Sequence, residues 1–172
     1  RNECKELLFV VEREADGREP SVRCINFGLD GMQSFSFTLE EERSAVLVPA
    51  GQVGTYLYEP NASVLKAGAF KQIAVRTGVK KLQVNSHLYT ADHLVSDFPG
   101  RRFRVDEVLS FTGKLCKGLS KTIPQANITV RNFPLSVEEL RKRTKITDGG
   151  HVYLFATTLV DGEKVLVKCS KA

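Results

Sequence analysis

The segment 54–78 constrains the fold more than any other part of the chain, because it joins a strand to a helix. Thr55–Tyr58 predicts a short strand, and Pro60 closes it. Asn61 is suited to accept backbone N–H bonds at a helix start, and Gly78 is the left-handed residue that commonly follows a helix end. We therefore expect one helix, from Asn61 to the residue before Gly78.

This helix is apolar on nearly all sides, which indicates burial on more than one face. Gly68 lies in its middle and costs about 1 kcal/mol relative to alanine, so we expect another backbone to lie close to it. Strands near Lys81–Val84 and His87–Thr90 complete a small sheet. Asp92–Gly100 then forms a connector.

The first 54 residues predict an antiparallel segment. Strands are expected at Leu7–Glu12, Ser21–Phe27 and Gln33–Leu39, and a helical turn at Glu40–Ala45. Three strands are too few to close a core alone. We expect this segment to pack against another part of a longer protein.

Residues 101–172 predict a compact unit with the order βαβαββ, which suits a sheet with helices on one face. Ser136 and Glu139 form a capping box that opens its second helix. Asp161-Gly162 predicts a type I′ turn in the terminal hairpin. The expected elements are a strand at Phe103–Phe111, a helix at Gly113–Thr122, a strand at Asn127–Arg131, a helix after Ser136, and strands at His151–Thr158 and Lys164–Cys169. The fold class is therefore α+β, with segments 1–54, 55–100 and 101–172.

The net charge of +5 hides a gradient along the chain. Residues 1–54 carry 6 Lys/Arg against 10 Asp/Glu, and residues 101–172 carry 14 against 7. Such a split favours a protein as the partner of residues 1–54 and a polyanion as the partner of residues 101–172. A solvated basic surface is the simpler alternative for residues 101–172. No segment approaches the roughly 20 apolar residues of a membrane span, so we expect no membrane partner.

The chain holds no recognisable active site. It lacks the glycine-rich turn of nucleotide-binding folds and the GxSxG nucleophile motif. His87, His93 and His151 have no carboxylate or thiol at metal spacing, so we interpret them as structural or surface residues. The four cysteines are scattered without a CxxC pair, which favours reduced thiols in a cytoplasmic protein. We expect no catalytic, cofactor-binding or metal-binding residue.

The candidate binding residues are basic. Three lysines of the expected helix 113–122 fall within about 60° of one another, opposite its apolar side. Three arginines stand at the start of the preceding strand. A third basic cluster, 141–145, also suits the negative end of a helix dipole. With no Trp and no aromatic ladder, RNA contact is expected through phosphates. The predicted nucleic-acid contacts are Arg101, Arg102, Arg104, Lys114, Lys117 and Lys121.

Three stretches carry a family resemblance. GTYLYEPNASVLKAGAF (54–70), RRFRVDEVLSFTGK (101–114) and RNECKELLFV (1–10) resemble the C-terminal region of bacterial class I S-adenosylmethionine (SAM)-dependent methyltransferases. The resemblance implies a ferredoxin-like segment at 55–100 and a THUMP-like domain at 101–172. It also implies an N-terminal methyltransferase domain of the same protein as partner, with SAM bound there and no cofactor in this chain. THUMP domains in RNA-modifying enzymes bind structured RNA.

Two functions are favoured, and a self-sufficient enzyme of unrecognised type is a third, weaker alternative. The chain begins at Arg1, directly before an expected strand, and its one methionine is Met32, so we expect the rear portion of a longer enzyme. That portion handles substrate, with RNA as the ligand, or it is a structural or oligomerisation module of a methyltransferase with a non-RNA acceptor. Asn132–Leu135 only faintly resembles the tetrapeptide of amino-group methyltransferases, and we interpret it as a turn.

Overall fold

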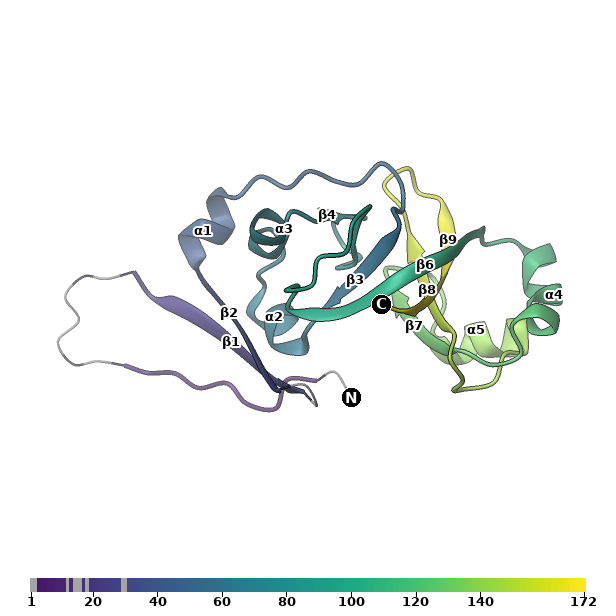
Figure 1. The fold of residues 1–172 in the computed structure, drawn as a ribbon, viewed down its shortest axis with the longest axis horizontal. Helices are drawn as coiled ribbons and strands as arrows, with labels where there is room; N and C mark the ends of the chain where they lie inside the picture. The colour runs from purple at the N-terminus through teal and green to yellow at the C-terminus, as the bar shows by residue number, and fades with distance from the viewer. Residues whose placement is uncertain (1–2, 12, 14–16, 18, 29–30) are drawn as a thin grey trace.

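The computed structural model describes residues 3–11, 13, 17, 19–28 and 31–172, and it has an α+β architecture (Figure 1). Two sheets are present in this part of the chain, a two-stranded one (β1-β2) and a seven-stranded one with the order β4-β5-β3-β6-β9-β8-β7. The elements are β1 (Ser21–Gly28), β2 (Gly31–Thr38), α1 (Leu39–Ser44), β3 (Tyr56–Pro60), α2 (Ala62–Ala67), α3 (Gln72–Thr77), β4 (Lys80–Lys81), β5 (Tyr89–Ala91), β6 (Gly100–Ser110), α4 (Gly113–Thr122), β7 (Asn127–Arg131), α5 (Val137–Thr144), β8 (Tyr153–Thr158) and β9 (Lys164–Lys171).

Strand β6 joins the two halves of the large sheet. Its first five residues pair antiparallel with β3, and most of its length pairs antiparallel with β9. Leu57 of β3 and Phe103 of β6 share one apolar cluster with Phe155 and Val167 of the C-terminal strands. The two halves are therefore joined by strand pairing and by a common core, in addition to the connector between them.

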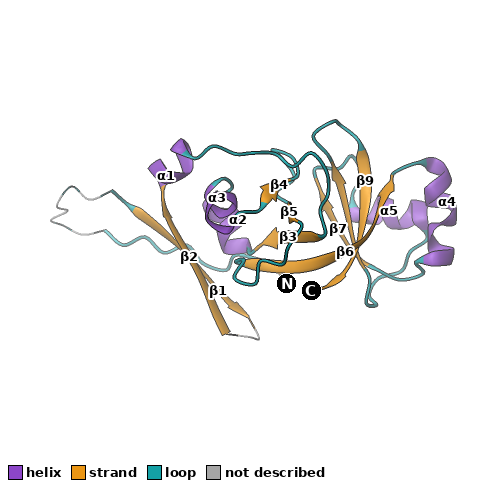
Figure 2. Ribbon diagram, turned by 45° about the horizontal axis from the view of Figure 1, so that its top comes forward, coloured by secondary structure: helices purple, strands orange, loops and turns teal. Residues whose placement is uncertain are grey.

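The C-terminal half has the predicted βαβαββ order. α5 connects β7 to β8, which pair in parallel. Both α4 and α5 lie at the end of the molecule formed by the C-terminal half (Figure 2), and Leu119 and Leu140 pack with Leu154 and Leu166 of the sheet. The predicted bounds of the helix at 113–122 and of the strand at 127–131 are confirmed.

The turn of the terminal hairpin differs from the prediction. In this fully described turn only Gly162 has a positive φ, 87°, whereas a type I′ turn needs positive φ at both central residues. The N–H of Leu159 bonds the carbonyl of Glu163 at 2.9 Å, so three residues form the loop instead of two.

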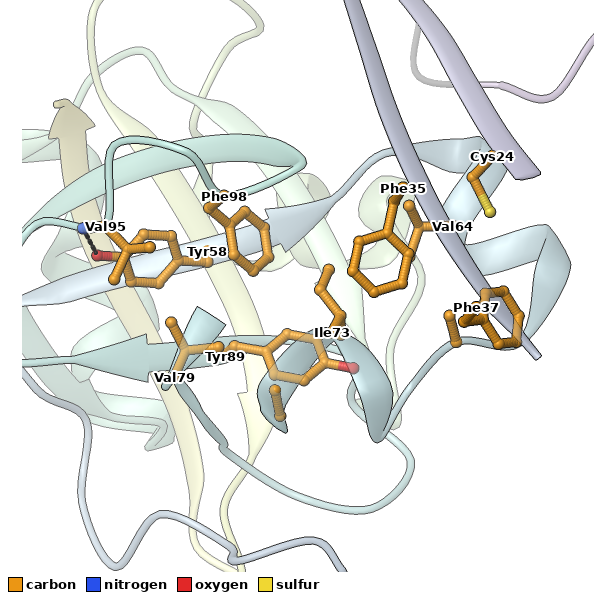
Figure 3. Packing of buried hydrophobic residues seen from close by; sticks show 12 residues of the cluster. Cys24, Phe35, Phe37, Tyr58, Val64, Ile73, Val79, Tyr89, Val95 and Phe98 are labelled. Carbon is orange, nitrogen blue, oxygen red and sulfur yellow. Dashed lines mark hydrogen bonds between the residues drawn. The ribbon is translucent and has the colours of Figure 1, made fainter. Parts of the chain in front are cut away.

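The β1–β2 hairpin packs one of its faces against the rest of the chain. Cys24, Phe35 and Phe37 point inward and join a cluster that contains Tyr58 and Ile73 (Figure 3). Arg76 of α3 fastens this contact, since its guanidinium lies 5.4 Å from the Phe35 ring centroid and 2.8 Å from a Glu41 carboxylate oxygen. The alternation of Phe and Ser in β2 correctly predicted this buried face.

The single helix expected over 61–77 is wrong. The chain forms α2 and α3 instead, because Gly68 adopts a φ of 77° and ends α2. An added Cβ at Gly68 would meet nothing within 4 Å. The positive φ, and not a close backbone, therefore explains why a glycine occupies this position. α3 then begins under the Glu42 carboxylate, which accepts the N–H groups of Lys71 and Gln72 at 2.9 and 2.8 Å. Asn61 precedes α2, but its side chain donates to Gln33 at 2.8 Å instead of capping.

The strand expected at Leu7–Glu12 is also absent from the described residues. Residues 7–11 have no strand partner there, and Glu12 lies outside the described part. A strand needs a neighbour for its backbone groups, and the described chain offers none. The strands expected near 81–84 and 87–90 shrink to β4 and β5 because the chain turns between them.

Two further observations concern the described helices and the cysteines. No described helix is long and apolar enough to cross a membrane. All four cysteines are free thiols, and three of them are buried. Burial raises the pKa of Cys24 to about 11 and that of Cys169 to about 12, so both thiols are unreactive at neutral pH.

A buried lysine organises the turn between β4 and β5. Lys81 is only 2% exposed, and its ammonium donates to the Val84 carbonyl at 2.7 Å. The same nitrogen lies 3.2 Å from Nδ1 of His87 and 4.8 Å from the ring centroid of Phe70, on which His87 stacks. Burial lowers the pKa of Lys81 to about 8. Burial and the nearby cations Lys81 and Arg131 lower the pKa of His87 to about 4.

The low pKa of His87 predicts acid sensitivity. Between about pH 6.5 and 4 this histidine is protonated in the unfolded state but neutral in the folded state. Its neutral form therefore costs no unfolding free energy above about pH 6.5, and the unfolding free energy falls as the pH is lowered from there towards 4. His87 has a φ of 52°, which asparagine tolerates. We expect His87→Asn to reduce the loss of unfolding free energy between pH 6.5 and 4.5 by about 1 kcal/mol. Urea unfolding at several pH values measures it. The exposed His93→Asn is the control, and equal pH slopes in both variants would contradict the assignment.

The close packing around Gly100 predicts that its replacement lowers the stability of the protein at any pH. A Cβ at this position would lie 2.2 Å from the Glu59 carbonyl oxygen and 2.6 Å from the Phe98 ring, so β3 and β6 would have to separate. We expect Gly100→Ala to destabilise the protein by about 2 kcal/mol or more. Gly118→Ala on the exposed side of α4 meets nothing within 4 Å and should instead stabilise by about 1 kcal/mol. Thermal unfolding compares the two, and a neutral Gly100→Ala would show that the strand contact is not tight.

Candidate nucleic-acid interface

Helix α4 forms a row of exposed cations. The Thr112 hydroxyl accepts the N–H of Leu115 at 3.1 Å and so starts the helix. Cys116 and Leu119 are buried, and Leu119 packs against the sheet, which turns the opposite side of the helix to solvent. Among the residues that the structure describes, no ion pair neutralises the lysines of this side. The three exposed lysines are Lys114, Lys117 and Lys121, as the helical periodicity predicted.

Helix α5 adds a cation beside this row. Lys142 and Arg143 are exposed near its C-terminal end, and Arg143 is the one that lies near Lys117. Arg143 and Lys117 together line a hollow of about 220 Å³ whose other walls include Phe111 and Cys116. We call Lys114, Lys117, Lys121 and Arg143 the α4–α5 basic face. Sequence reasoning found the α4 part by periodicity, but it could not tell that the end of α5 lies next to it.

Arg141 makes structural contacts and is not part of the α4–α5 basic face. Its guanidinium pairs with Asp148 and donates to the carbonyls of Ala126 and Ile146 at 3.1 and 3.3 Å. These bonds hold the loop after α5 against the start of β7. Within the predicted basic cluster at 141–145, Arg141 is therefore not available to a ligand.

The three predicted arginines of β6 lie at the other end of the strand. From Arg101 to Ser110 the extended backbone covers about 30 Å. Arg102 donates to the carbonyl of Ser96, and Arg104 is exposed. The structure therefore brings Lys114, Lys117 and Lys121 together but separates them from Arg101, Arg102 and Arg104, so the six residues form two groups.

Arg101 is held in a cluster around a buried carboxylate. Glu59 is 1% exposed, and one of its oxygens accepts from Nε of Arg101 at 2.8 Å and also pairs with the Nη2 group. Its other oxygen lies 2.9 Å from Nη2 of Arg131 at the end of β7. Glu59 thus neutralises part of the positive charge here and ties β3 to β6 and β7. The sequence placed Arg101 correctly on a strand but gave no signal for its partner, and Arg131 was not predicted as part of any cluster.

The tetrapeptide that begins at Asn132 makes contacts within the fold. Asn132 adopts a φ of 52°, donates to Gln83 at 3.0 Å, and its carbonyl accepts from the Thr158 hydroxyl at 2.7 Å. It leads into the Ser136–Glu139 capping box, which confirms the interpretation of this tetrapeptide as a turn. The described residues include no group of three or more His, Cys, Asp or Glu side chains that could hold a metal ion.

Removal of the Glu59 charge is expected to loosen the sheet. Glu59→Gln keeps the shape of the side chain but leaves two arginines facing each other without an anion. Because both guanidinium groups are partly exposed, we expect a loss of about 2 kcal/mol in unfolding free energy, less than for a fully buried pair. Glu107→Gln, on an exposed position of β6, is the control and should change stability by less than about 0.5 kcal/mol. Equal effects of the two changes in a denaturant titration would exclude a special role for Glu59.

Comparison with known proteins agrees with this architecture. Residues 56–99 match the family model of a ferredoxin-like domain, and residues 100–171 match that of a THUMP domain-like family. The chain is also similar to a crystal structure of a candidate methyltransferase from Porphyromonas gingivalis W83, with 47% sequence identity and a TM-score of 0.84. The match covers 88% of this chain and 38% of that one, so the chain spans well under half of the related protein's length.

No curated protein matches the chain. The expected α+β fold is nevertheless confirmed, since the antiparallel β1–β2 pair precedes a larger mixed sheet. Within this sheet, residues 56–171 consist of a ferredoxin-like domain followed directly by a THUMP-like domain.

Proposed function

We propose that this chain is the substrate-handling region of a SAM-dependent methyltransferase, and that its α4–α5 basic face binds the phosphates of structured RNA. The observation that carries the proposal is the row of three exposed α4 lysines without ion-pair partners among the described residues, set in a THUMP-like domain. The similarity to a candidate methyltransferase supports the methyltransferase part.

The chemistry of the basic face suits phosphate better than bases. Lysine ammonium groups act as point charges, and Arg143 can form two parallel bonds to one phosphate. Gly118 lies on the same side of α4 with open space over it, so a ligand can approach the helix backbone there. Phosphate contacts fix position without reading sequence. In this proposal the face therefore orients the RNA, and base selection occurs elsewhere.

The chain itself does not fit a SAM site. No described glycine forms the glycine-rich strand-to-helix turn that such a fold uses to hold the cofactor. In this proposal SAM therefore binds to a methyltransferase domain that precedes this sequence, and that domain supplies the methyl group. The residues described here bind and position, and none of them takes part in methyl transfer.

Arg101, Arg102 and Arg104 remain predicted contacts for a long RNA only. A ligand must extend about 30 Å along β6 to reach both groups. Arg101 already shares the Glu59 carboxylate, so its guanidinium is less free for a phosphate than the α4 lysines are. A structured RNA is long enough to reach both ends, whereas a mononucleotide is not.

Charge reversal tests the basic face. We expect the triple variant Lys114→Glu, Lys117→Glu, Lys121→Glu to weaken binding of total bacterial RNA about tenfold or more at moderate salt. Loss of three phosphate contacts should also lower the slope of log affinity against log salt by about 2 to 3. Filter binding at several salt concentrations measures both quantities.

A matched control separates a site from overall charge. Lys66, Lys80 and Lys171 are exposed and lie outside the basic face, and their reversal to Glu changes the net charge by the same amount. This control should retain most of its affinity. Equal losses in both triple variants would mean unspecific attraction. Unchanged binding by the α4 variant, or no RNA binding by the parent chain, would favour a structural module of a methyltransferase with a different acceptor.

A further inference from the structure

The two ends of the seven-stranded sheet meet in space, although β4 and β7 lie at opposite ends of the strand order. Asn132, directly after β7, donates to Gln83 between β4 and β5 at 3.0 Å. Arg131 of β7 lies 2.9 Å from a carboxylate oxygen of Glu59 in β3. The sheet is therefore curled, and its inner face surrounds the apolar cluster to which Leu57 belongs.

Polar side chains continue this inner face at one end. Leu57, Phe103 and Phe155 belong to the apolar cluster. Side chains two positions apart in a strand point to the same side of the sheet, and residues paired across two strands also share a side. The polar residues that therefore face inward here are Glu59, Arg101, Thr157 and, opposite Thr157 in the β7–β8 register, Arg131. We call these residues the inner polar cluster.

Two groups of the inner polar cluster are buried without a hydrogen-bond partner among the described residues. They are Nε of Arg131 and the hydroxyl of Thr157, a residue that is 0% exposed. Because the two residues are paired in the register, both groups lie in the same part of the inner face. A buried polar group without a partner is unfavourable, so these groups indicate a ligand that bears hydrogen-bond acceptors.

Positive charge exceeds negative charge at this place. Arg101 and Arg131 pair with the same carboxylate, that of Glu59. The Lys81 ammonium lies beside them, 3.2 Å from Nδ1 of His87. Burial and the charges of Lys81 and Arg131 lower the pKa of His87 to about 4, so this imidazole is neutral. Within the described chain, two arginines and one lysine thus stand against one carboxylate, and a negatively charged ligand is favoured.

A phosphate group fits these donors better than a carboxylate or water does. The donors come from β6, β7 and β8 and so approach from different directions, which suits the tetrahedral oxygens of phosphate. A carboxylate offers two oxygens in one plane. Water satisfies buried polar groups but leaves the positive charge without a counter-ion. The side chains of Arg101 and Arg131 are 43% and 35% exposed, so a ligand can reach them from solvent.

From these observations we propose that the inner polar cluster is a phosphate-binding site. Nε of Arg131 and the Thr157 hydroxyl donate to phosphate oxygens, and Arg101 supplies further positive charge. The site lies between the ferredoxin-like and THUMP-like domains, because it uses strands of both. The phosphate belongs either to a free anion or to a nucleic-acid backbone. The site shares no residue with the α4–α5 basic face and requires neither RNA binding by that face nor methyl transfer.

A single hydroxyl tests the site. Inorganic phosphate is titrated into the 172-residue chain by calorimetry at constant ionic strength. We expect Thr157→Val to weaken phosphate binding about tenfold, because one bond to a charged ligand is lost. Without phosphate the same change should raise Tm by about 2 to 4 °C, because an unpaired buried hydroxyl is removed.

The matched control is the next residue of β8, which points to the opposite face. The Thr158 hydroxyl donates to the Asn132 carbonyl at 2.7 Å. Thr158→Val should therefore lower Tm and leave the affinity for inorganic phosphate unchanged. A role of Thr157 in stability alone would change Tm but not the affinity for phosphate.

The Nε–H group of Arg131 reports the bond directly. In NMR spectra of nitrogen-labelled protein, its signal is identified by its loss in Arg131→Lys. We expect this signal to move when phosphate is added and to stay in place when chloride is added. The variant with all three α4 lysines reversed to Glu should show the same movement, so failure of the RNA proposal and failure of this inference can be distinguished.

Two probes distinguish the sources of the phosphate. Loss of affinity of Thr157→Val for total bacterial RNA, about tenfold, would identify a nucleic-acid phosphate. A loss for inorganic phosphate alone would identify a free anion. Equal affinities of Thr157→Val and the parent chain for both probes would overturn the inference, as would an Arg131 signal that neither probe moves. The two buried groups would then bind water only.

Discussion

The contact between β3 and β6 is the interaction on which the rest of the structure depends. It makes the ferredoxin-like and THUMP-like domains parts of one sheet, with Leu57 and Phe103 in a common core. Gly100 allows the two backbones to approach, since any side chain there would collide with Glu59 and Phe98. The Glu59 carboxylate then draws Arg101 and Arg131 together across the sheet. A joint of this kind resists bending, so the orientation of the basic face relative to the ferredoxin-like domain is fixed.

That fixed orientation matters for a binding module. The α4–α5 basic face lies in the THUMP-like domain, whereas the exposed apolar side chains Phe27 and Met32 lie on the outer side of the β1–β2 hairpin. If the basic face holds a polyanion, a rigid body behind it fixes the position of that ligand relative to the ferredoxin-like domain. Rigid placement of this type is more precise than a flexible linker, because little conformational freedom has to be lost on binding.

Local signals in the sequence predicted much of the C-terminal half. The Ser136–Glu139 capping box and the apolar side of α4 are properties of short segments, and both appear where they were expected. Non-local features could not be predicted in this way. The start of α3, for example, lies under the carboxylate of Glu42, which accepts the N–H of Gln72 from 30 positions earlier in the chain. The partner of Arg101 likewise lies 42 positions away, and a buried carboxylate has no signature of its own in sequence.

The sequence by itself determined the α+β class, the order of elements from β6 onward, the charge gradient and the row of lysines on α4. These depend on periodicity and on residues within a few positions of each other, so they can be read without a fold. Only the tertiary structure decided which cations share a surface. It placed Arg143 beside Lys117 and moved the β6 arginines to the far end of a strand, one of them against a buried carboxylate. Charges interact through space and not along the chain, and packing of the sheet and helices sets those distances.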